Sequence, residues 1–314
     1  MESTGQPINH QVSLSAMWIN DRYDAIDNFI SNIKEWGFTH IEPNSSIPSQ
    51  TLDKIVRSST PISSLHSPCP HSISSTGVPV KELSLSSIHE PERREAVHYA
   101  KKTIELASST GAGAIVIHLG EIPLDISLQD KMYLLCEKGN INSTEYKHIR
   151  ALLVTARTSD AAPYVEAAER SLKELCTYGI QQNVLIGIET RYHFHEIPDI
   201  NEMERFLNEV RNNTVGYWHD TGHAEIQQKL DLTSHIEWLS RFKHRMIGAH
   251  IHDVTGITDH YCPGMGTVDW NMIAELIPQQ IIKVCEIGQW NDENHMRNII
   301  PFLIQKGILL KESI

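Results

Sequence analysis

The feature that most constrains the fold is an alternation of short apolar runs with longer amphipathic stretches, repeated along the whole chain. Eight runs have the length and composition of buried strands, at residues 12–18, 39–43, 62–66, 114–119, 184–190, 215–220, 246–252 and 283–287. Eight stretches between and after them place apolar residues at helical spacing, at residues 23–36, 50–57, 92–108, 161–178, 200–210, 234–241, 270–277 and 293–306. Strands that alternate with helices pair in parallel through right-handed crossovers.

Eight such units most simply close on themselves. We therefore expect an α/β protein with the (β/α)8 TIM-barrel fold, formed as a single domain over residues 1–314, a length that suits one barrel with loop insertions. The runner-up is an open doubly wound sheet, but no G-x-G-x-x-G motif follows the first strand. Residues 121–160 exceed the minimal unit length. They predict an extended loop and extra helix after strand four, over the active-site mouth.

Composition narrows the class of function. The net charge of −12 disfavours a polyanionic partner, so we expect a small molecule and no nucleic acid. No apolar run is long enough to cross a membrane. The first ten residues, 1–10, lack the pattern of a secretory signal, and the five cysteines form no C-x-x-C pair. We expect a cytoplasmic protein with free thiols.

Six consecutive predicted strands end in His, Glu or Asp directly after apolar residues. These strand ends carry His66, His118, Glu189, Asp220, His250 and Glu286. The last four are separated by 31, 30 and 36 residues, about one βα unit each. Their side chains should therefore reach the same height at the C-terminal mouth of a barrel.

The charges of these residues point to a metal. Two glutamates and an aspartate buried together cost several kcal/mol each unless a positive charge compensates them. Arg191 is the one cation at these strand ends. We therefore predict that Glu189, Asp220, His250 and Glu286 hold a divalent ion. Mixed carboxylate and imidazole ligands suit zinc, manganese, iron or cobalt better than calcium, and magnesium also stays open.

Other histidines have two readings each. His66 alone would most often be a hydrogen-bonded core or loop residue. His223, in the turn Asp-Thr-Gly-His, is either a ligand or a cap of the following helix. His260 precedes the rigid Pro-Gly-x-Gly turn of a predicted loop at 258–270, and it either points inward or packs against that turn.

The strand-end motifs resemble those of the xylose isomerase-like TIM barrels, a group that includes sugar isomerases and epimerases, inosose dehydratases and apurinic endonuclease IV. The matching motifs are Gly-Ile-Glu-Thr-Arg at 187–191, His-Asp-Thr-Gly-His at 219–223, Gly-Ala-His-Ile-His-Asp at 248–253, Asp-His-x-x-Pro-Gly-x-Gly-x-Val-Asp-Trp at 259–270 and Glu-Ile-Gly at 286–288. The similarity runs over essentially the whole chain and rests on these motifs, which identify the superfamily but not one reaction within it.

The resemblance implies roles for these residues. Glu189, Asp220, His250 and Glu286 match the metal ligands of the epimerases, with Glu189 and Glu286 also acting as the acid and base. His66 and His118 look like ligands of a second zinc in endonuclease IV, and His223 and His260 look like ligands of a third. The aspartate that completes the third site is replaced by Thr258, with Asp259 next to it. Where ketose 3-epimerases have a substrate-binding glutamate, this chain has His195, followed by Glu196.

Four functions follow as expectations. The first is a metal-dependent sugar isomerase or epimerase acting through an enediolate, with His223 and Arg191 orienting substrate oxygens and His66 and His118 lining the pocket. A keto-polyol dehydratase or lyase would use the same first step. An endonuclease IV-like zinc phosphodiesterase and a non-catalytic metal or sugar binder are the other two. The expected partner is a sugar or polyol, and association into a homo-oligomer stays open.

Overall fold

Eight parallel strands form a closed barrel in the computed structural model, which describes residues 12–210 and 212–310. Their order is β2-β1-β10-β7-β6-β5-β4-β3. Their bounds are β1 Val12–Ser15, β2 His40–Glu42, β3 Ser64–His66, β4 Ala114–Ile117, β5 Leu185–Glu189, β6 Val215–Asp220, β7 Met246–Ile251 and β10 Ile282–Cys285. Ile41 closes the ring, because its N–H donates to the Pro61 carbonyl at 2.9 Å and its carbonyl accepts from Ser63 N–H at 3.2 Å. The predicted eight-stranded α/β barrel is confirmed.

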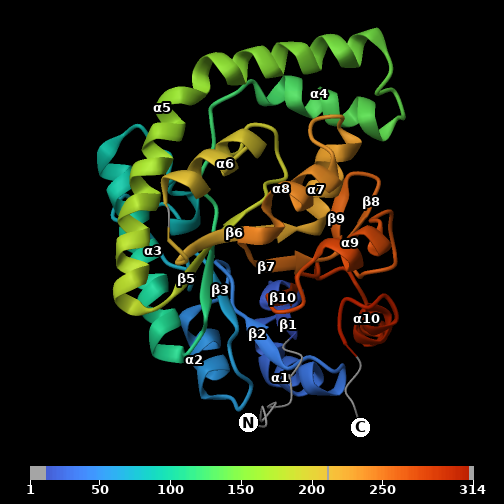
Figure 1. The fold of residues 1–314 in the computed structure, drawn as a ribbon. Coiled ribbons are helices and arrows are strands. Elements are labelled where there is room, and N and C mark those ends of the chain that lie inside the picture. Colours follow the sequence, from blue (N-terminus) through green and yellow to red (C-terminus); the bar gives the residue numbers. More distant parts are fainter. Residues whose placement is uncertain (1–11, 211, 311–314) are drawn as a thin grey trace, which may run out of the picture.

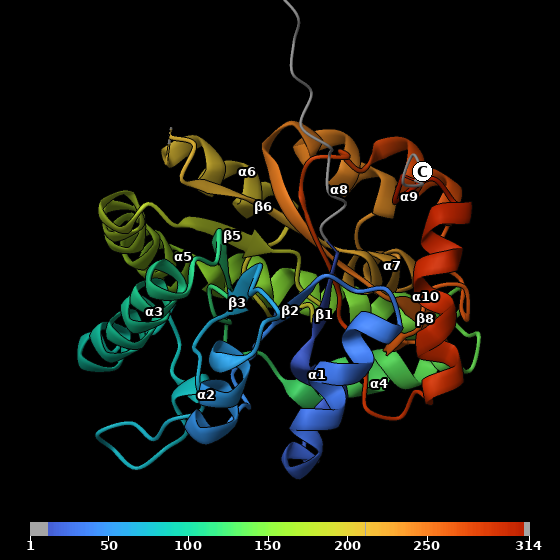
Figure 2. The ribbon, with the colours of Figure 1, turned by 90° about the horizontal axis from the view of Figure 1, so that it is seen from below.

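Helices surround the strands on the outside of the barrel, as the view from below shows (Figure 2). Their bounds are α1 Ile26–Glu35, α2 Ser49–Arg57, α3 Glu90–Thr110, α4 Ile126–Glu137, α5 Thr144–Gln182, α6 Ile200–Glu209, α7 Thr221–Lys229, α8 His235–Phe242, α9 Trp270–Leu276 and α10 Glu293–Gln305. Short 3-10 turns occur at Ala16–Ile19, Tyr23–Ala25, Val80–Glu82 and Lys243–Arg245.

No helix in the described ranges is long and apolar enough to cross a membrane. Residues 1–10, on which the expected lack of a secretory signal depends, lie outside the described part of the chain.

The structure differs from the expected elements at four places. Strand one ends at Ser15, because the chain turns into the 3-10 helix Ala16–Ile19. The helix expected at 161–178 begins earlier, so that α5 covers Thr144–Gln182. Helix α7 was not expected, and it begins directly after β6. Part of the loop expected at 258–270 pairs as a hairpin of β8, Asp253–Thr255, and β9, Thr258–Tyr261.

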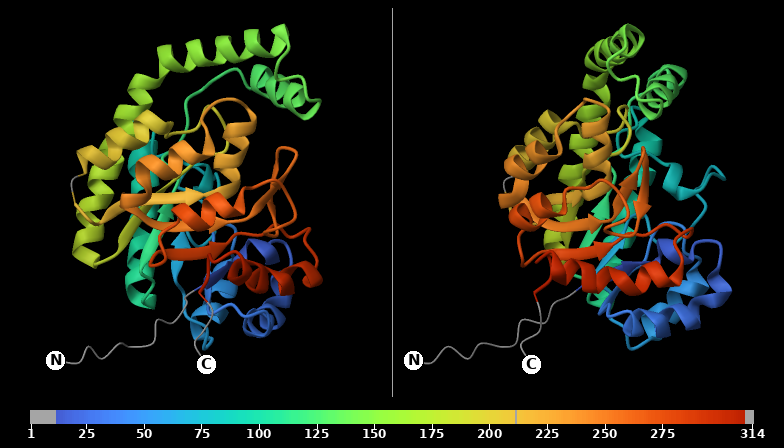
Figure 3. Two further views of the ribbon diagram at one scale, coloured as in Figure 1. Left: turned by 45° about the vertical axis from the view of Figure 1, so that its right-hand side comes forward. Right: turned by 90° about the vertical axis from the view of Figure 1, so that its right-hand side faces the viewer.

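The extended region after strand four is confirmed, and it is mostly helical. Helix α4 and the first half of α5 run together across the top of the molecule (Figures 1 and 3). Pro163 lies inside α5, where it cannot donate a backbone hydrogen bond, and the helix bends between its two halves. Both helices contact the loop after β5: Gln129 approaches His195 at 2.9 Å, and Arg157 Nε donates to the Phe194 carbonyl at 2.9 Å.

A tryptophan fills the barrel beneath the strand ends. Trp218 is fully buried and clusters with Ala114, Val116 and Val284. A Cβ placed on Gly187 would lie 2.7 Å from the Trp218 ring, and one on Gly248 would lie 2.1 Å from it. Side chains two residues apart on a strand share a face, so these glycines lie directly beneath Glu189 and His250. The glycines leave room for the indole, which supports the layer above it.

Candidate metal centre

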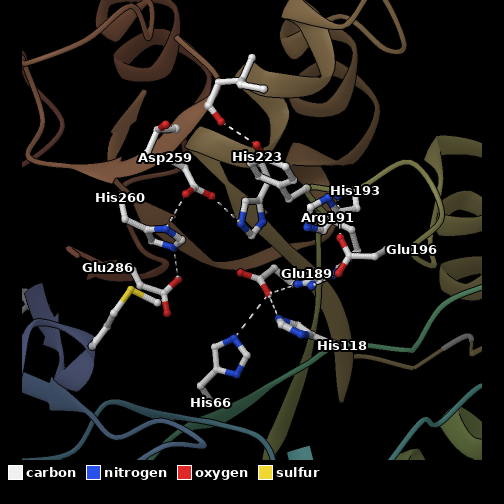
Figure 4. A pocket seen from close by; sticks show the side chains of 14 residues that line it. His66, His118, Glu189, Arg191, His193, Glu196, His223, Asp259, His260 and Glu286 are labelled. Atoms are coloured by element: carbon white, nitrogen blue, oxygen red, sulfur yellow. Dashed lines mark hydrogen bonds and ion pairs between the residues drawn. The ribbon is translucent and has the colours of Figure 1, made fainter. Parts of the chain in front are cut away.

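A cavity of about 440 Å³ opens at the C-terminal ends of the strands. Side chains from several strand ends and from the loops after β5 and β7 point into it (Figure 4). This is the end of the barrel where the sequence predicted the site, and where active sites of TIM barrels lie.

Four residues form what we call the inner ring: Glu189, Asp220, His250 and Glu286. They end β5 and β6, lie within β7, and directly follow β10. One potential ligand atom from each lies within 4.8 Å of the others, and all four residues are buried. The spacing of about one βα unit predicted this convergence because each unit returns the chain to the same end of the barrel.

Three carboxylates of the inner ring surround one imidazole nitrogen. His250 Nδ1 lies 2.5 Å from Glu189 Oε1, 3.2 Å from Glu286 Oε2 and 3.7 Å from Asp220 Oδ2. Burial alone would lower the pKa of His250, but the charges of Glu286, Glu42 and Glu189 outweigh burial and raise this pKa well above its usual value. The site therefore favours a positive charge at the point where the carboxylates meet.

Partners outside the ring fix its carboxylates. Asp220 accepts the His223 backbone N–H at 2.7 Å and caps α7, and His252 Nε2 lies 2.9 Å from its Oδ1. His252 Nδ1 accepts the His260 backbone N–H at 3.0 Å, so the ring proton of a neutral His252 is on Nε2, facing Asp220. Arg191 Nη1 donates to Glu189 Oε2 at 3.0 Å.

Four further histidines form what we call the histidine rim: His66, His118, His223 and His260. On one side of the cavity, His118 Nε2 lies 2.6 Å and His66 Nε2 3.5 Å from the same Glu189 oxygen. Their rings meet edge to face, with centroids 4.6 Å apart. The structure thus brings His66 and His118, which the resemblance implied as ligands of a second ion, together beside Glu189.

On the opposite side, a carboxylate lies between the other two rim histidines (Figure 4). Asp259 Oδ1 is 2.8 Å from His260 Nδ1, and Asp259 Oδ2 is 3.4 Å from His223 Nε2. His223 Nδ1 also donates to the Thr190 carbonyl at 2.8 Å. Although Asp259 is displaced by one residue from the aspartate of endonuclease IV, its carboxylate still reaches this corner of the cavity.

The loop that carries His260 is organised by one buried aspartate. Both oxygens of Asp253 accept N–H groups: Oδ1 from Val254 and Val268, and Oδ2 from Gly264 and from the Trp270 indole. His260 has a φ of 59°, in the left-handed region that non-glycine residues seldom occupy. The loop therefore holds His260 and Asp259 in a conformation that sequence spacing does not reveal.

A buried ion pair lies beside the inner ring. Arg191 Nη2 pairs with Glu196 Oε1, and Glu196 Oε2 accepts the His193 backbone N–H at 2.6 Å. Burial would raise the pKa of Glu196, but Arg191 outweighs it and lowers this pKa to about 2. Glu196 thus lines the cavity, whereas His195 turns toward Gln129 at 2.9 Å and Glu121 at 3.4 Å.

Two residues of the site, Glu42 and His252, were not singled out from the sequence. Glu42 Oε1 lies 2.9 Å from His250 Nε2, on the side of the imidazole that faces away from the inner-ring carboxylates. Glu42 is the next-to-last residue of the strand expected at 39–43, but a lone glutamate near a strand end is a weak signal. His252 lies two residues after the expected ligand His250, and only the structure shows which atoms it faces.

The donor set fits a divalent cation. Three carboxylates and one imidazole nitrogen provide the oxygen and nitrogen ligands that zinc, manganese and cobalt accept. Nε2 of His250, the nitrogen that faces away from the inner ring, is hydrogen-bonded to the Glu42 carboxylate. Such outer carboxylate partners commonly orient histidines that bind metals. In this structure a charged His250 supplies the compensating positive charge, and an ion bound to Nδ1 would replace that proton.

Comparisons with known proteins agree with the fold. The sequence model of a family described as the xylose isomerase-like TIM barrel matches residues 30–304. An uncharacterised protein of Sinorhizobium fredii, y4fM, is 26% identical over 273 residues, which are 81% of this chain and 77% of that protein.

Solved structures of similar fold include sugar epimerases. The 3-keto-D-glucoside 4-epimerase YcjR from E. coli superposes with a TM-score of 0.65 and 13% identity, over 95% of this chain and 100% of that one. D-Allulose 3-epimerase from Methylomonas sp., in complex with D-allulose, gives 0.66 and 12%, over 94% and 96%. The IOLI protein with a bound zinc atom gives 0.64 and 12%, over 95% and 98%. At these identities the likeness concerns the fold.

Proposed function

Because the chain belongs to the xylose isomerase-like TIM barrel family, we propose that it is a metal-dependent isomerase or epimerase of a sugar or sugar derivative. The observation that carries the proposal is the convergence of Glu189, Glu286 and Asp220 on the inner nitrogen of His250. The sugar epimerases among the similar structures support the choice of substrate class.

The inner ring would hold one divalent ion. When bound, that ion supplies the Lewis acidity that polarises a substrate carbonyl and its neighbouring hydroxyl. Asp220 and His250 have only this ligand role, since His252 and Glu42 already engage them from behind.

Glu189 and Glu286 are the catalytic pair of the proposal. Burial raises the pKa of each carboxyl, but His250 outweighs it, so that the pKa of Glu286 falls to about 2 and that of Glu189 falls well below its usual value. Both are therefore ionised at neutral pH, as a base requires. They come from β5 and from the end of β10, separated in the barrel by β6 and β7, so they reach a substrate carbon from different sides. One carboxylate removes the proton next to the carbonyl to give an enediolate. The other, after taking a proton from water, delivers it to the opposite side of the carbon, and the first then releases its proton to water.

The surrounding residues would orient the substrate. His223 Nε2 and the Arg191 guanidinium face the cavity beside the inner ring, where they can donate to substrate hydroxyls (Figure 4). Arg191 is already paired with Glu189 and Glu196. The site is thus matched to uncharged oxygens, and a dehydratase or lyase acting on a keto-polyol would begin with the same proton abstraction.

Proton exchange tests this proposal. The metal-loaded protein is incubated in heavy water with a panel of ketohexoses, 3-keto-glucosides and keto-inositols, and deuterium at the α-carbon is measured by NMR. We expect deuterium to enter at least one substrate, and Glu286→Gln to abolish the exchange. The control is Glu202→Gln, which changes a glutamate that caps α6 and pairs with Arg157 rather than with the inner ring. Absence of exchange from the whole panel would contradict the proposal.

One observation favours a second function, a zinc phosphodiesterase of the endonuclease IV kind. Both groups of rim histidines lie beside a carboxylate, which gives the cavity enough ligands for further ions. The net charge of −12 opposes a nucleic-acid substrate. Cleavage of a duplex that carries an abasic site, by protein with three zinc ions per chain, would support this function over sugar chemistry.

A further inference from the structure

Glu42 lies three strands away, around the barrel, from the strand that carries His250. It ends β2 and is fully buried, and β1 and β10 separate β2 from β7 in the barrel. Its Oε1 nevertheless lies 2.9 Å from His250 Nε2, so the Glu42 side chain reaches through the barrel interior. A buried carboxyl group is costly unless it is fully hydrogen-bonded, so its partners determine what it does there.

A chain of serine hydroxyls supports the other oxygen of Glu42. Ser64 Oγ donates to Glu42 Oε2 at 2.5 Å. Ser63 Oγ lies 3.2 Å from Ser64 Oγ, and Ser13 Oγ donates to Ser63 Oγ at 2.5 Å. Each hydroxyl has one proton, so the chain is directional, and every hydroxyl proton points toward Glu42. All three serines are buried, and they belong to β1, to β3 and to the residue before β3.

This arrangement determines which nitrogen of His250 carries a proton. With Oε2 accepting from Ser64, Oε1 of Glu42 is free to accept from His250 Nε2–H. A neutral imidazole carries one ring proton, so Nδ1 then presents its lone pair to the inner carboxylates. With the opposite tautomer, an Nδ1–H would donate to Glu189 at 2.5 Å and would block the nitrogen as a ligand.

We infer that Glu42 is a positioning residue, which fixes the tautomer and orientation of His250 so that Nδ1 can bind a divalent ion. The inference rests on the proposed function, because it takes the inner ring as the metal site. Outer partners of this kind typically contribute about 10- to 100-fold to metal affinity.

Cobalt titration of the metal-free protein tests the inference. The change Glu42→Gln keeps the size of the side chain but adds an amide NH2, which can donate to Nε2 and favour the wrong tautomer. We expect Co²⁺ to bind this variant about 10- to 100-fold more weakly than wild type, with an altered visible absorption spectrum. Ser64→Ala removes the support of Glu42 and should show a smaller loss in the same direction. Glu202→Gln is the matched control, a glutamate with no contact to the ring, and its Co²⁺ affinity and spectrum should equal those of wild type.

The outcomes separate this inference from the proposed function. If Glu42→Gln binds Co²⁺ within twofold of wild type and with the same spectrum, Glu42 is structural only and the inference is overturned. If Glu42→Gln does not fold, Ser64→Ala decides, since unchanged affinity in that variant also overturns the inference. If the wild-type protein itself takes up no Co²⁺, the proposed metal site fails and the inference fails with it.

Discussion

The inner ring and the histidine rim share one cavity, but they are built differently. The inner-ring side chains are at most 4% exposed, and Glu42, His252 and Arg191 each hydrogen-bond to one of them. The rim side chains are 9–40% exposed. Three of the four, His66, His223 and His260, approach a facing carboxylate oxygen through Nε2 at 3.4–3.5 Å. The difference indicates a ring prepared for one fixed ion and a rim whose polar groups can change partners when substrate binds.

The largest effect should appear when a substitution in the inner ring is compared with one in the histidine rim in a metal-binding assay. Glu189→Gln removes a ligand of the proposed ion, so its Zn²⁺ affinity should fall by more than the roughly 100-fold that loss of an outer partner costs. His118→Gln removes a rim contact to the same glutamate and should lower the affinity by less than about tenfold. Chelator competition measures both. If His118→Gln loses as much affinity as Glu189→Gln, the ion belongs to the rim.

One added methyl group should disrupt the packing of Trp218 beneath the inner ring. Gly248→Ala would place a Cβ 2.1 Å from the Trp218 ring, inside a packed barrel. We expect the free energy of unfolding to fall by about 3 kcal/mol, the upper end of the usual cost of overpacking. Gly113→Ala is the control, because the nearest atoms to its Cβ would lie 3.8 Å away. Urea unfolding should show that variant unchanged, and equal stability of both variants would contradict this account of the barrel floor.

The stability of the metal-free protein should depend on pH because of His223 in the histidine rim. Burial lowers the pKa of His223, but Asp220 and Asp259 outweigh it and raise this pKa to about 9. The folded state therefore holds a proton that the unfolded state releases near pH 6.5, so this stability is complete below pH 6.5 and is lost as the pH rises through about 9. At most about 3 kcal/mol is involved, at 1.36 kcal/mol per pKa unit.

Unfolding of the metal-free protein between pH 6 and 10 measures this contribution. Stability of the wild type should fall across the range, and His223→Gln should flatten the curve. His89→Gln, at an exposed position before α3, should retain the wild-type slope. A His223→Gln protein with the same pH dependence as wild type would show that the rim carries no such proton.

The smallest effect should come from the contact between helix α4 and the loop after β5. Tyr133 Oη, on α4, lies 3.2 Å from His193 Nδ1 in the loop that lines the cavity. Tyr133→Phe removes a hydrogen bond worth about 1 kcal/mol, so KM should rise about fivefold. Metal content and kcat should stay the same, because the inner ring is not touched. A change in metal content would show that this contact also affects metal binding by the inner ring.

The sequence predicts the ring better than its surroundings because the ring depends on periodicity. Each βα unit returns the chain to the mouth, so the spacing of Glu189, Asp220 and His250 was enough to bring them together. The contact between Glu42 and His250 spans 208 residues and crosses the barrel, and no local pattern encodes it. The left-handed conformation of His260, next to Asp259, is also not evident from residue spacing.

Two helical segments, the first half of α5 and α7, were also poorly predicted from local sequence patterns. The first half of α5 buries Tyr146, Ile149 and Leu153 at helical spacing, but it continues that stripe with Arg157, whose partners are the Glu202 carboxylate and the Phe194 carbonyl. Helix α7 was missed because Thr221–Gln227 are all buried, polar residues included, and show no polar face. Both elements contact other loops of the barrel, so tertiary contacts stabilise them more than local pattern does.

The central claim is that the inner ring, rather than the rim, holds the ion. A crystal of the protein grown with Mn²⁺ and measured at a wavelength that gives anomalous scattering from manganese tests it directly. We predict one strong anomalous peak bonded to Glu189, Asp220, His250 Nδ1 and Glu286, with Glu42 still on Nε2 of His250. A peak held only by His66, His118 and Glu189, or no peak within the ring, would contradict the account.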